Sequence, residues 1–312
     1  MTTPEPQRDA NQVIGVDVGG TKVLAAVVSR DGSLGARTER PTDVSSEEAF
    51  LGQLDAMVEE LRDGEPDVAA LGFGLPSRID QRLGRAVASV NIPLQHVDFR
   101  DRMRERHGVL VGIDNDGNAA AIAEWQAGAA QGADDVVMVT FGTGVGGGLI
   151  LGGKPYRGAT GSGAELGHVV VELDGRTCAC GGRGHLESYA TGREAGKQAQ
   201  EQFGEGVDER ELVRRAEDGD GAAVELLARI GRYVGAAMAT YVNALEPALI
   251  VIGGGFGEAA FEFLRASARE VIVRDALEPG RDTVSIVHAE LGTDAGVIGA
   301  GMIAFEALRA ES

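Results

Sequence analysis

The feature that most constrains the fold is a unit of strand, glycine-containing loop and strand near the start of the chain. The apolar run Val13–Val18 is typical of a buried strand, and the loop Gly19-Gly20-Thr21-Lys22 follows it directly. A second apolar run, Val23–Ser29, ends at the turn signal Asp31-Gly32. The pattern predicts a β-hairpin, because the segment after the loop is a strand and not a helix.

The same unit recurs about 120 residues later, which indicates two related lobes rather than a solenoid. Val136–Phe141 is the strand, 142–148 the glycine loop and Leu149–Leu151 the return strand. A chain of 312 residues is also longer than a single core usually serves. The expected parts are a smaller N-terminal α/β lobe at 13–120, a larger C-terminal α/β lobe at 121–294 and a final helix at 295–310 that packs back on the first lobe.

The charge balance excludes several classes of partner. The chain has 29 Lys and Arg against 48 Asp and Glu, a formal net charge of −19. Such a protein is repelled by nucleic acid and by anionic membrane surfaces. No apolar run approaches the ~18 residues of a membrane-spanning helix, and the polar start Met1–Asn11 lacks the apolar core of a secretory signal. We expect a cytoplasmic protein.

The two glycine loops are not standard nucleotide motifs, because each runs into a strand where a P-loop or a dinucleotide fingerprint requires a helix. In a single hairpin, glycine would only permit a turn with positive φ. Two such loops, each with a threonine, instead favour a pair of backbone N–H nests that clamp a polyphosphate. The candidate nucleotide-binding residues are Gly19, Gly20, Thr21, Lys22, Gly142, Thr143 and Gly144. Asp17, at the mouth of the first loop, is positioned to orient Mg²⁺.

A third glycine cluster has a different context. Gly253-Gly254-Gly255 follows the buried strand Leu249–Ile252 and precedes a helix. At such a point a flat ligand such as adenosine can lie against the backbone, and Gly254 and Gly255 are its candidate contacts. Tight packing of the helix on the strand explains these glycines equally well.

The candidate general base is Asp116. Asn115-Asp116-Gly117-Asn118 lies between a buried strand and a helix that we expect at Asn118–Ala127. Asp and Asn are preferred helix N-caps, so capping is the simpler interpretation. The segment holds more acidic and amide groups than a cap needs, however, and a carboxylate at a strand end can accept a proton from a hydroxyl nucleophile.

Four potential metal ligands gather in one short region. The chain has only two cysteines and five histidines, yet Cys178, Cys180 and His185 lie close together and His168 lies just upstream. Two thiolates and two imidazoles suit a closed, structural tetrahedral zinc site. Reduced cysteines beside solvent-facing histidines are the alternative. Zinc here would order the loop that carries Glu165 and Glu187 rather than perform chemistry.

Taken in order, these motifs resemble the ROK family of sugar kinases, and its ATP-dependent bacterial glucokinases in particular. The resemblance spans nearly the whole chain and rests on a specific ordered set: 16–22, 115–120, 142–146, 165–168 and 178–187. It implies the actin-like ATPase fold, which is ribonuclease H-like, with ATP and sugar in a cleft between two lobes. It also implies transfer of the γ-phosphate to the sugar 6-hydroxyl, with Asp116 as the base. Glucose is the expected substrate.

The resemblance also implies which residues contact the sugar. By matched position they are Asn91, Asn115, Asp116, Glu165, His168 and Glu187. His168 would bind zinc through one ring nitrogen and face the sugar with the other. Because relatives are commonly dimers or tetramers, we expect a homo-oligomer.

The chain departs from the family pattern at two positions. His185 stands where the zinc loop usually has a third cysteine, and Ser77 stands where glycine is common. Histidine is a competent zinc ligand, but Ser77 leaves the identity of the hexose open. N-acetylhexosamine, mannose or fructose kinases, a catalytically silent sugar-binding protein and polyphosphate as donor remain alternatives. The family's regulators carry a DNA-binding segment ahead of the first glycine loop, where this chain has only a dozen residues.

Overall fold

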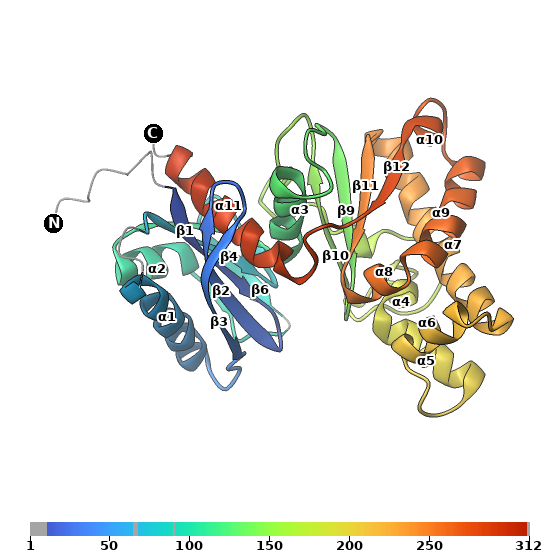
Figure 1. Ribbon diagram of the computed structural model, residues 1–312, viewed down its shortest axis with the longest axis horizontal. Coiled ribbons are helices and arrows are strands. Elements are labelled where there is room, and N and C mark those ends of the chain that lie inside the picture. The colour runs from blue at the N-terminus through green and yellow to red at the C-terminus, as the bar shows by residue number, and fades with distance from the viewer. Residues whose placement is uncertain (1–10, 65–67, 90, 311–312) are drawn as a thin grey trace. The chain divides into compact units, whose positions relative to one another are not determined.

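The computed structural model describes residues 11–64, 68–89 and 91–310, which form two compact α/β units (Figure 1). Unit 1 contains the described residues up to Gln131, the segment Pro155–Ala164 and the chain from Thr293 onward. Unit 2 contains Gly132–Lys154 and Glu165–Gly292. The boundary that we expected near residue 120 falls inside helix α3 (Asp116–Ala127), which belongs whole to unit 1.

Unit 1 is built on a five-stranded sheet with the order β3-β2-β1-β4-β8. Its strands are β1 (Gln12–Val18), β2 (Lys22–Ser29), β3 (Leu34–Pro41), β4 (Ala70–Leu75) and β8 (Leu110–Asn115). The first three form an antiparallel meander, whereas β4 and β8 run parallel to β1. A smaller antiparallel sheet comprises β5 (Ser77–Asp80), β6 (Arg85–Ser89) and β7 (Gln95–Val97).

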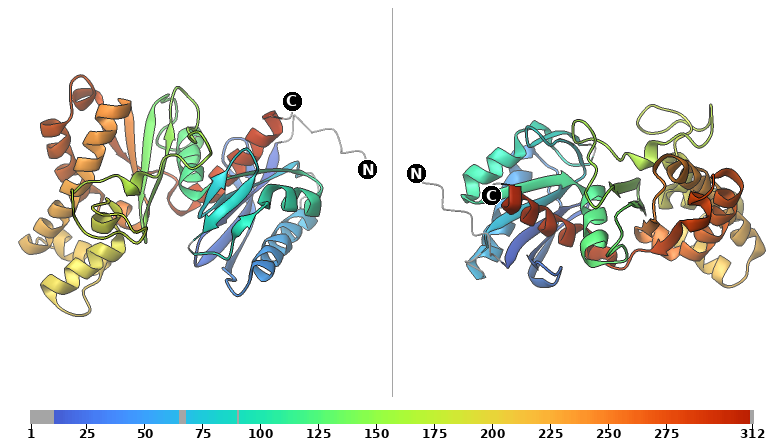
Figure 2. Two further views of the ribbon diagram at one scale, coloured as in Figure 1. Left: turned by 180° about the vertical axis from the view of Figure 1, so that it is seen from behind. Right: turned by 90° about the horizontal axis from the view of Figure 1, so that it is seen from above.

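Helices cover both faces of the main sheet of unit 1 (Figures 1 and 2). One face packs against α1 (Glu47–Gly64) and α2 (Phe99–His107) in an apolar core that contains Phe50, Leu54 and Phe99. Ser46 caps the start of α1, because its hydroxyl accepts a hydrogen bond from the N–H of Ala49 at 3.1 Å.

The other face packs against α11 (Ala295–Ala310), with α3 beside it. Here Gly15, Gly72 and Gly112 lie on three adjacent strands and let the helix backbone approach the sheet. A Cβ at Gly72 would lie 1.8 Å from the carbonyl oxygen of Ala300, so no side chain fits. Close backbone packing therefore explains part of the high glycine content.

Unit 2 repeats the strand order of unit 1. Its sheet has the order β10-β9-β11-β12, with strands β9 (Val136–Phe141), β10 (Val145–Ile150), β11 (Leu249–Gly253) and β12 (Ser285–His288). Strands β9 and β10 form an antiparallel hairpin, and β11 and β12 extend the sheet in parallel from β9. The four strands β2-β1-β4-β8 have the same arrangement, so the predicted duplication of a glycine-loop hairpin is confirmed.

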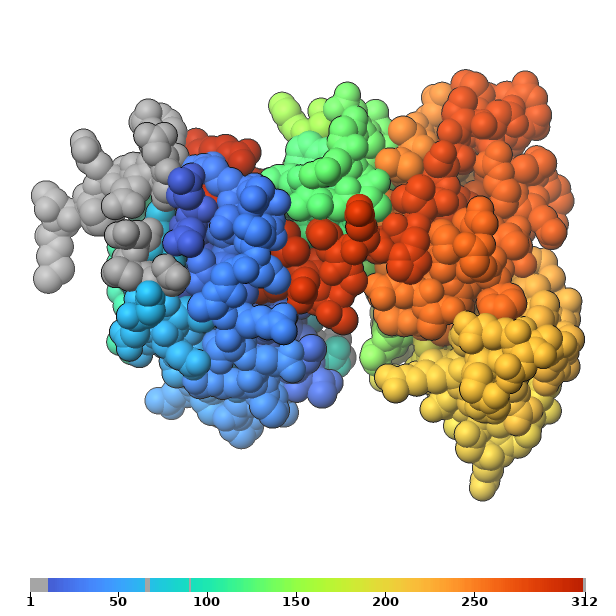
Figure 3. All heavy atoms as spheres, in the orientation of Figure 1, coloured from blue at the N-terminus to red at the C-terminus, as the bar shows by residue number. Residues whose placement is uncertain are grey.

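The remaining elements of unit 2 are mostly helical. They are η1 (Leu166–His168), α4 (Glu187–Ala190), α5 (Gly192–Phe203), α6 (Glu209–Glu217), α7 (Gly221–Leu245), α8 (Gly255–Ala259), α9 (Phe261–Asp275) and α10 (Gly280–Thr283), with η2 (Gly292–Asp294) leading into unit 1. Helices α7 and α9 pack closely, because Gly231 and Gly235 on α7 admit the backbone of α9. The α5–α6 region lies at the surface of unit 2 (yellow in Figure 3). Among the described residues, none of the helices combines the length and the apolar character needed to cross a lipid bilayer.

Two element boundaries differ from the sequence-based expectation. Strand β10 begins at Val145, so the glycines at 146–148 lie in the strand and the second loop is only 142–144. A Cβ at Gly147 would lie 2.3 Å from the carbonyl oxygen of Met138, which explains that glycine by packing. Helix α3 begins at Asp116 rather than Asn118, because Asn115 caps it. Strand β3, the small sheet and α2 were not anticipated.

Candidate functional site

The first glycine loop is a tight turn held by its neighbours. The N–H of Gly19 donates to the carbonyl of Lys22 at 2.9 Å, and the Thr42 hydroxyl donates to the carbonyl of Gly19 at 2.7 Å. The Lys22 ammonium lies 2.8 Å from a carboxylate oxygen of Glu39 in a half-exposed ion pair. The loop backbone is therefore fixed by hydrogen bonds, and the side chain of Lys22 on β2 pairs with Glu39 on the neighbouring strand β3.

Gly20 brings this loop against a residue that we expected on the sugar side. A Cβ at Gly20 would lie 2.8 Å from the Cβ of Asn91, so only glycine permits this approach. Two segments far apart in the sequence thus meet within unit 1. The expected nucleotide loop and the expected sugar contact are direct neighbours.

Asp17 and Asp116 also come together in unit 1. Asp17 is the penultimate residue of β1, and Asp116 directly follows β8. Both strands run parallel to β4, and Gly74 of β4 lies between the two residues. A Cβ at Gly74 would be 3.8 Å from Oδ1 of Asp17 and 3.8 Å from Cα of Asp116. Gly296, in the first turn of α11, presses on the Asp17 carboxyl from another side, since a Cβ there would be 2.4 Å from its Cγ.

The Asp17 carboxyl is strongly perturbed by its surroundings. Burial raises its pKa from 3.8 to about 6, although the nearby positive charge of Lys22 acts in the opposite direction. A strand-end carboxyl with such a pKa is typical of functional sites, because burial that costs stability is retained where chemistry needs it.

The turn between β8 and α3 presents Asp116. The side-chain oxygen of Asn115 accepts hydrogen bonds from the N–H groups of Gly117 at 2.9 Å and Asn118 at 3.4 Å, so it is the N-cap. Its amide nitrogen donates to the carbonyl of Ser77 at 3.4 Å. The capping interpretation therefore holds for Asn115, while Asp116 is the first residue of the helix and its Oδ1 accepts from the N–H of Gly117 at 2.9 Å.

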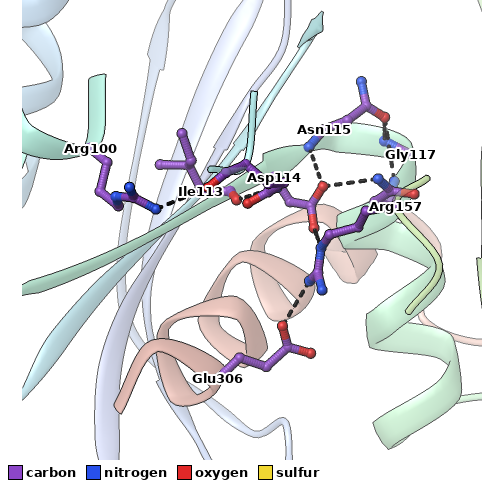
Figure 4. Close-up of polar contacts among 9 residues, drawn as sticks. Arg100, Ile113, Asp114, Asn115, Gly117, Arg157 and Glu306 are labelled. Atoms are coloured by element: carbon purple, nitrogen blue, oxygen red, sulfur yellow. Dashed lines mark hydrogen bonds and ion pairs between the residues drawn. The ribbon is translucent and has the colours of Figure 1, made fainter. Parts of the chain in front are cut away.

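A buried ionic network, which sequence reasoning missed, lies directly beneath this turn (Figure 4). Asp114 is fully buried and accepts a hydrogen bond from Nε of Arg157 at 2.5 Å. Nη2 of the same guanidinium binds Glu306 on α11 at 2.7 Å. Because these residues are far apart in the chain, no local sequence pattern signals the contact.

In unit 2 the second glycine loop contacts Glu187. The N–H of Gly142 donates to the carbonyl of Gly144 at 3.0 Å, which closes the turn around Thr143. The N–H of Val145 donates to Oε2 of Glu187 at 3.1 Å. Glu187, expected as a sugar contact, is thus held beside the expected phosphate loop.

Four ligand atoms gather in the predicted metal site. The ligand atoms of His168, Cys178, Cys180 and His185 all lie within 4.8 Å of one another. Nδ1 of His185 is 3.3 Å from Nδ1 of His168 and 3.3 Å from Sγ of Cys180, and Sγ of Cys178 is 3.8 Å from Nδ1 of His168.

The three separations of 3.3–3.8 Å are those expected between ligands in a tetrahedral metal site. Metal–ligand bonds of ~2.0–2.3 Å place the ligand atoms of a tetrahedron roughly 3.3–3.8 Å apart. Two glycines in the loop serve this geometry: Gly181 has a φ of +92°, and a Cβ at Gly182 would strike the ring of His185 at 2.4 Å. The donor set therefore suits zinc, and His185 lies where it can be the fourth ligand.

The elements next to this cluster fix the orientation of His168. Its Nδ1 points into the cluster, whereas its Nε2 lies 4.0 Å from Oε2 of Glu165. The hydroxyl of Tyr241 anchors η1 by donating to the carbonyl of Leu166 at 2.7 Å. Oε1 of Glu187 lies 3.8 Å from Sγ of Cys178, so unit 2 brings Glu165, His168 and Glu187 around one cluster.

The glycines of the third cluster, 253–255, have different roles: packing explains one of them, whereas another has room for a ligand. Gly254 has a φ of +81°, and a Cβ there would lie 2.7 Å from the backbone of Phe141, so packing and conformation alone require glycine. A Cβ at Gly255 would meet no atom of the described residues within 4 Å. Open space at Gly255 is compatible with a ligand.

Comparison with known proteins shows the family. The ROK family profile matches residues 13–307, and the chain belongs to this family. It is 34% identical to the glucokinase of Thermotoga maritima over 94% of this chain and 96% of that one. It is 32% identical to the N-acetylmannosamine kinase of Shigella flexneri over 94% of this chain and 98% of that one.

Solved structures agree on the fold. A ROK family glucokinase from Streptomyces griseus, in complex with glucose and AMPPNP, superposes with a TM-score of 0.82 at 33% identity, covering 95% of this chain and 99% of that one. A ROK family transcriptional regulator shares the fold with a TM-score of 0.88 at 24% identity, covering 96% of this chain and 79% of the regulator. The mixed α/β, two-lobed, actin-like fold predicted from the motifs is confirmed.

Proposed function

We propose that this protein is an ATP-dependent hexose kinase that converts glucose to glucose 6-phosphate. The observation that carries the proposal is the pair of carboxyl groups on unit 1: Asp116 begins α3, and Asp17, the penultimate residue of β1, lies on the other side of Gly74. One carboxylate placed to accept a proton and a second beside a glycine loop are what phosphoryl transfer to an alcohol requires. The names of similar relatives, and a similar structure solved in complex with glucose, support the same reaction.

In the proposed reaction Asp116 accepts the proton of the sugar 6-hydroxyl. The hydroxyl oxygen then forms a bond to the γ-phosphorus of ATP, the bond to the β–γ bridging oxygen breaks, and ADP leaves with that electron pair. Because the transition state is loose, catalysis depends mainly on positioning and charge. The N-cap at Asn115 and the first turn of α3 supply that positioning for Asp116.

The sugar and the nucleotide are assigned to the remaining residues of the site. We assign the sugar hydroxyls to Asn91, Asn115, Glu165, His168 and Glu187. We assign the nucleotide to Gly19, Gly20, Thr21, Lys22, Gly142, Thr143, Gly144, Gly254 and Gly255. Carboxylate and amide groups recognise hydroxyls by paired hydrogen bonds, and a site built from them rejects a missing hydroxyl strongly.

Two metal ions complete the proposal. Mg²⁺ accompanies ATP, and the Asp17 carboxyl is the oxygen ligand suited to orient it, since a cation would compensate the cost of its burial. Zinc would be held by His168, Cys178, Cys180 and His185, with all four corners occupied by protein. In a closed site of this kind the ion orders the loop; His168 then keeps its Nε2 toward Glu165 and the sugar.

A second candidate is an N-acetylmannosamine kinase, which the 32% identity to the Shigella flexneri enzyme favours. Ser77 is the departure from the family pattern that concerns the choice of substrate, because its carbonyl accepts a hydrogen bond from the side-chain amide of Asn115, a proposed sugar contact. A kinetic matrix separates the candidates: release of ADP, or consumption of polyphosphate, is measured with glucose, mannose, fructose, N-acetylglucosamine and N-acetylmannosamine. We expect the highest kcat/KM with ATP and glucose. Turnover with none of the sugars would refute the kinase proposal, and a clear preference for N-acetylmannosamine would replace its substrate.

A further inference from the structure

The carboxylate of Asp114 is the centre of the polar network under the β8–α3 turn. It is fully buried, and a buried carboxylate is stable only when it is paired and fully hydrogen-bonded. Its Oδ1 accepts from the N–H of Asn115 at 2.8 Å and from the side-chain amide of Asn118 at 2.9 Å. Its Oδ2 accepts from Nε of Arg157 at 2.5 Å (Figure 4). The two acceptor oxygens thus hold residues on both sides of Asp116.

Arg157 reaches this carboxylate from a segment that is distant in the chain. Pro155–Ala164 lies between β10 and η1 in sequence, yet it packs in unit 1. Within unit 1 the N–H of Gln81 donates to the carbonyl of Thr160 at 3.2 Å, and the N–H of Gly163 closes the segment on the carbonyl of Arg157 at 2.9 Å. The segment is therefore built to present the arginine at a defined place.

The other end of the guanidinium fixes the network to α11. Nη2 of Arg157 binds Glu306 at 2.7 Å while Nε binds Asp114, so one planar group bridges two carboxylates. The same helix presses on the Asp17 carboxyl through Gly296. Both functional carboxyl groups of unit 1 are thereby positioned relative to one rigid element.

We propose that Arg157 is a positioning residue for phosphoryl transfer: by holding Asp114 it fixes the backbone of Asn115 and the amide of Asn118, and so gives Asp116 a single orientation. This inference rests on the proposed function insofar as Asp116 is the base. A misplacement of about 1 Å at a reacting group costs on the order of 100-fold in rate, so a loose turn would reduce kcat even in a folded protein.

The first test is Arg157→Lys, which keeps the charge but lacks the planar fork that serves two carboxylates. The matched control is Arg102→Lys, because Arg102 also pairs with a buried aspartate of unit 1, Asp55 at 3.0 Å, away from the turn. We expect Arg157→Lys to lower kcat roughly 10- to 100-fold with KM changed less than about threefold. Arg102→Lys should leave kcat within about twofold even if both variants lose thermal stability to the same degree. Equal kcat in Arg157→Lys and wild type would overturn the inference.

A double variant separates positioning from stability. Arg157→Met alone leaves the charge of Asp114 buried and unpaired, which is strongly destabilising and can prevent folding. Arg157→Met combined with Asp114→Leu removes both charges of the pair. We expect thermal stability to return only in part, because the N–H of Asn115 and the amide of Asn118 lose their acceptor, while kcat stays low. Recovery of kcat together with stability would show that the pair serves the fold alone.

Hydrogen exchange tests the same inference without any turnover. In the wild type the N–H of Asn115 is bonded to Asp114, so its exchange with D₂O should be slow. We expect exchange of this amide to be at least about tenfold faster in Arg157→Lys than in the wild type, and unchanged in Arg102→Lys. Unchanged exchange in Arg157→Lys would refute the positioning role. Failure of wild-type protein to phosphorylate any sugar would instead refute the proposed function and leave the exchange result standing.

Discussion

The pKa of Asp17 makes a quantitative prediction about stability. Burial raises this pKa from 3.8 to about 6, so the folded state resists ionisation of the group. For a carboxyl whose pKa is raised by folding, the penalty is absent below pH 3.8, grows as the pH rises toward 6 and is complete above it. At one pKa unit per ~1.4 kcal/mol, ionised Asp17 destabilises the protein by on the order of 2–3 kcal/mol at pH 7.5. At pH 5 the same relation gives on the order of 1.5 kcal/mol.

The perturbation that isolates this penalty is Asp17→Asn, which keeps the shape of the side chain and removes its titration. Urea unfolding of wild type and variant at pH 5 and pH 7.5 gives the two free energies of unfolding. We expect the variant to gain stability relative to wild type by roughly 1–1.5 kcal/mol between the two pH values. Asp63→Asn, a change at an exposed residue of α1, is the control and should show no such change. A difference between Asp17→Asn and wild type that is constant with pH, or that shrinks as the pH rises, would refute the reasoning.

Three further predictions concern other contacts of the site. Gly296→Ala places a Cβ 2.4 Å from the carboxyl of Asp17, so kcat should fall roughly tenfold or more. In the control variant Gly52→Ala the added Cβ meets no described atom within 4 Å, so α1 should gain up to ~1 kcal/mol of stability and kcat should not change. Equal kcat values for the two variants would contradict the packing argument. Cys180→Ala removes one of the four candidate zinc ligands. Elemental analysis should find about one zinc per chain in the wild type and much less in the variant, and full retention of zinc would exclude Cys180 as a ligand. Tyr241→Phe removes the hydroxyl that donates a hydrogen bond to the carbonyl of Leu166 at the start of η1. Burial raises the pKa of this phenol, so the hydrogen bond persists through the neutral and mildly alkaline range. The free energy of unfolding in urea should therefore fall by about 1–3 kcal/mol in the variant, and an unchanged value would contradict this role.

The parts of the fold that the sequence predicts are those written in local patterns. The two hairpins follow from apolar runs that flank glycine loops, and the strand order around β1 and β9 repeats accordingly. The metal cluster was predictable because four rare ligands lie within one short region. In each case the residues that meet in space are also near in sequence, or the pattern is repeated.

The parts that could not be predicted depend on tertiary approach. Gly72 is a glycine because α11 lies against it, and Gly147 because a neighbouring strand does, so neither belongs to a ligand loop. The Arg157–Asp114 pair joins residues from separate parts of the chain. Helix α3 starts at Asp116 because Asn115 caps it. Helix propensity alone predicts the position of such a start only to within a turn.

The most direct test of the proposed function is the turnover of Asp116→Asn with ATP and glucose, beside wild type and Asp63→Asn. Replacing the carboxylate with an amide removes the proton acceptor and preserves the shape of the side chain at the start of α3. We predict a loss in kcat of roughly 100- to 10,000-fold for Asp116→Asn, with unchanged unfolding by urea and with the exposed control within about twofold of wild type. A value of kcat for folded Asp116→Asn within tenfold of wild type would show that the base lies elsewhere.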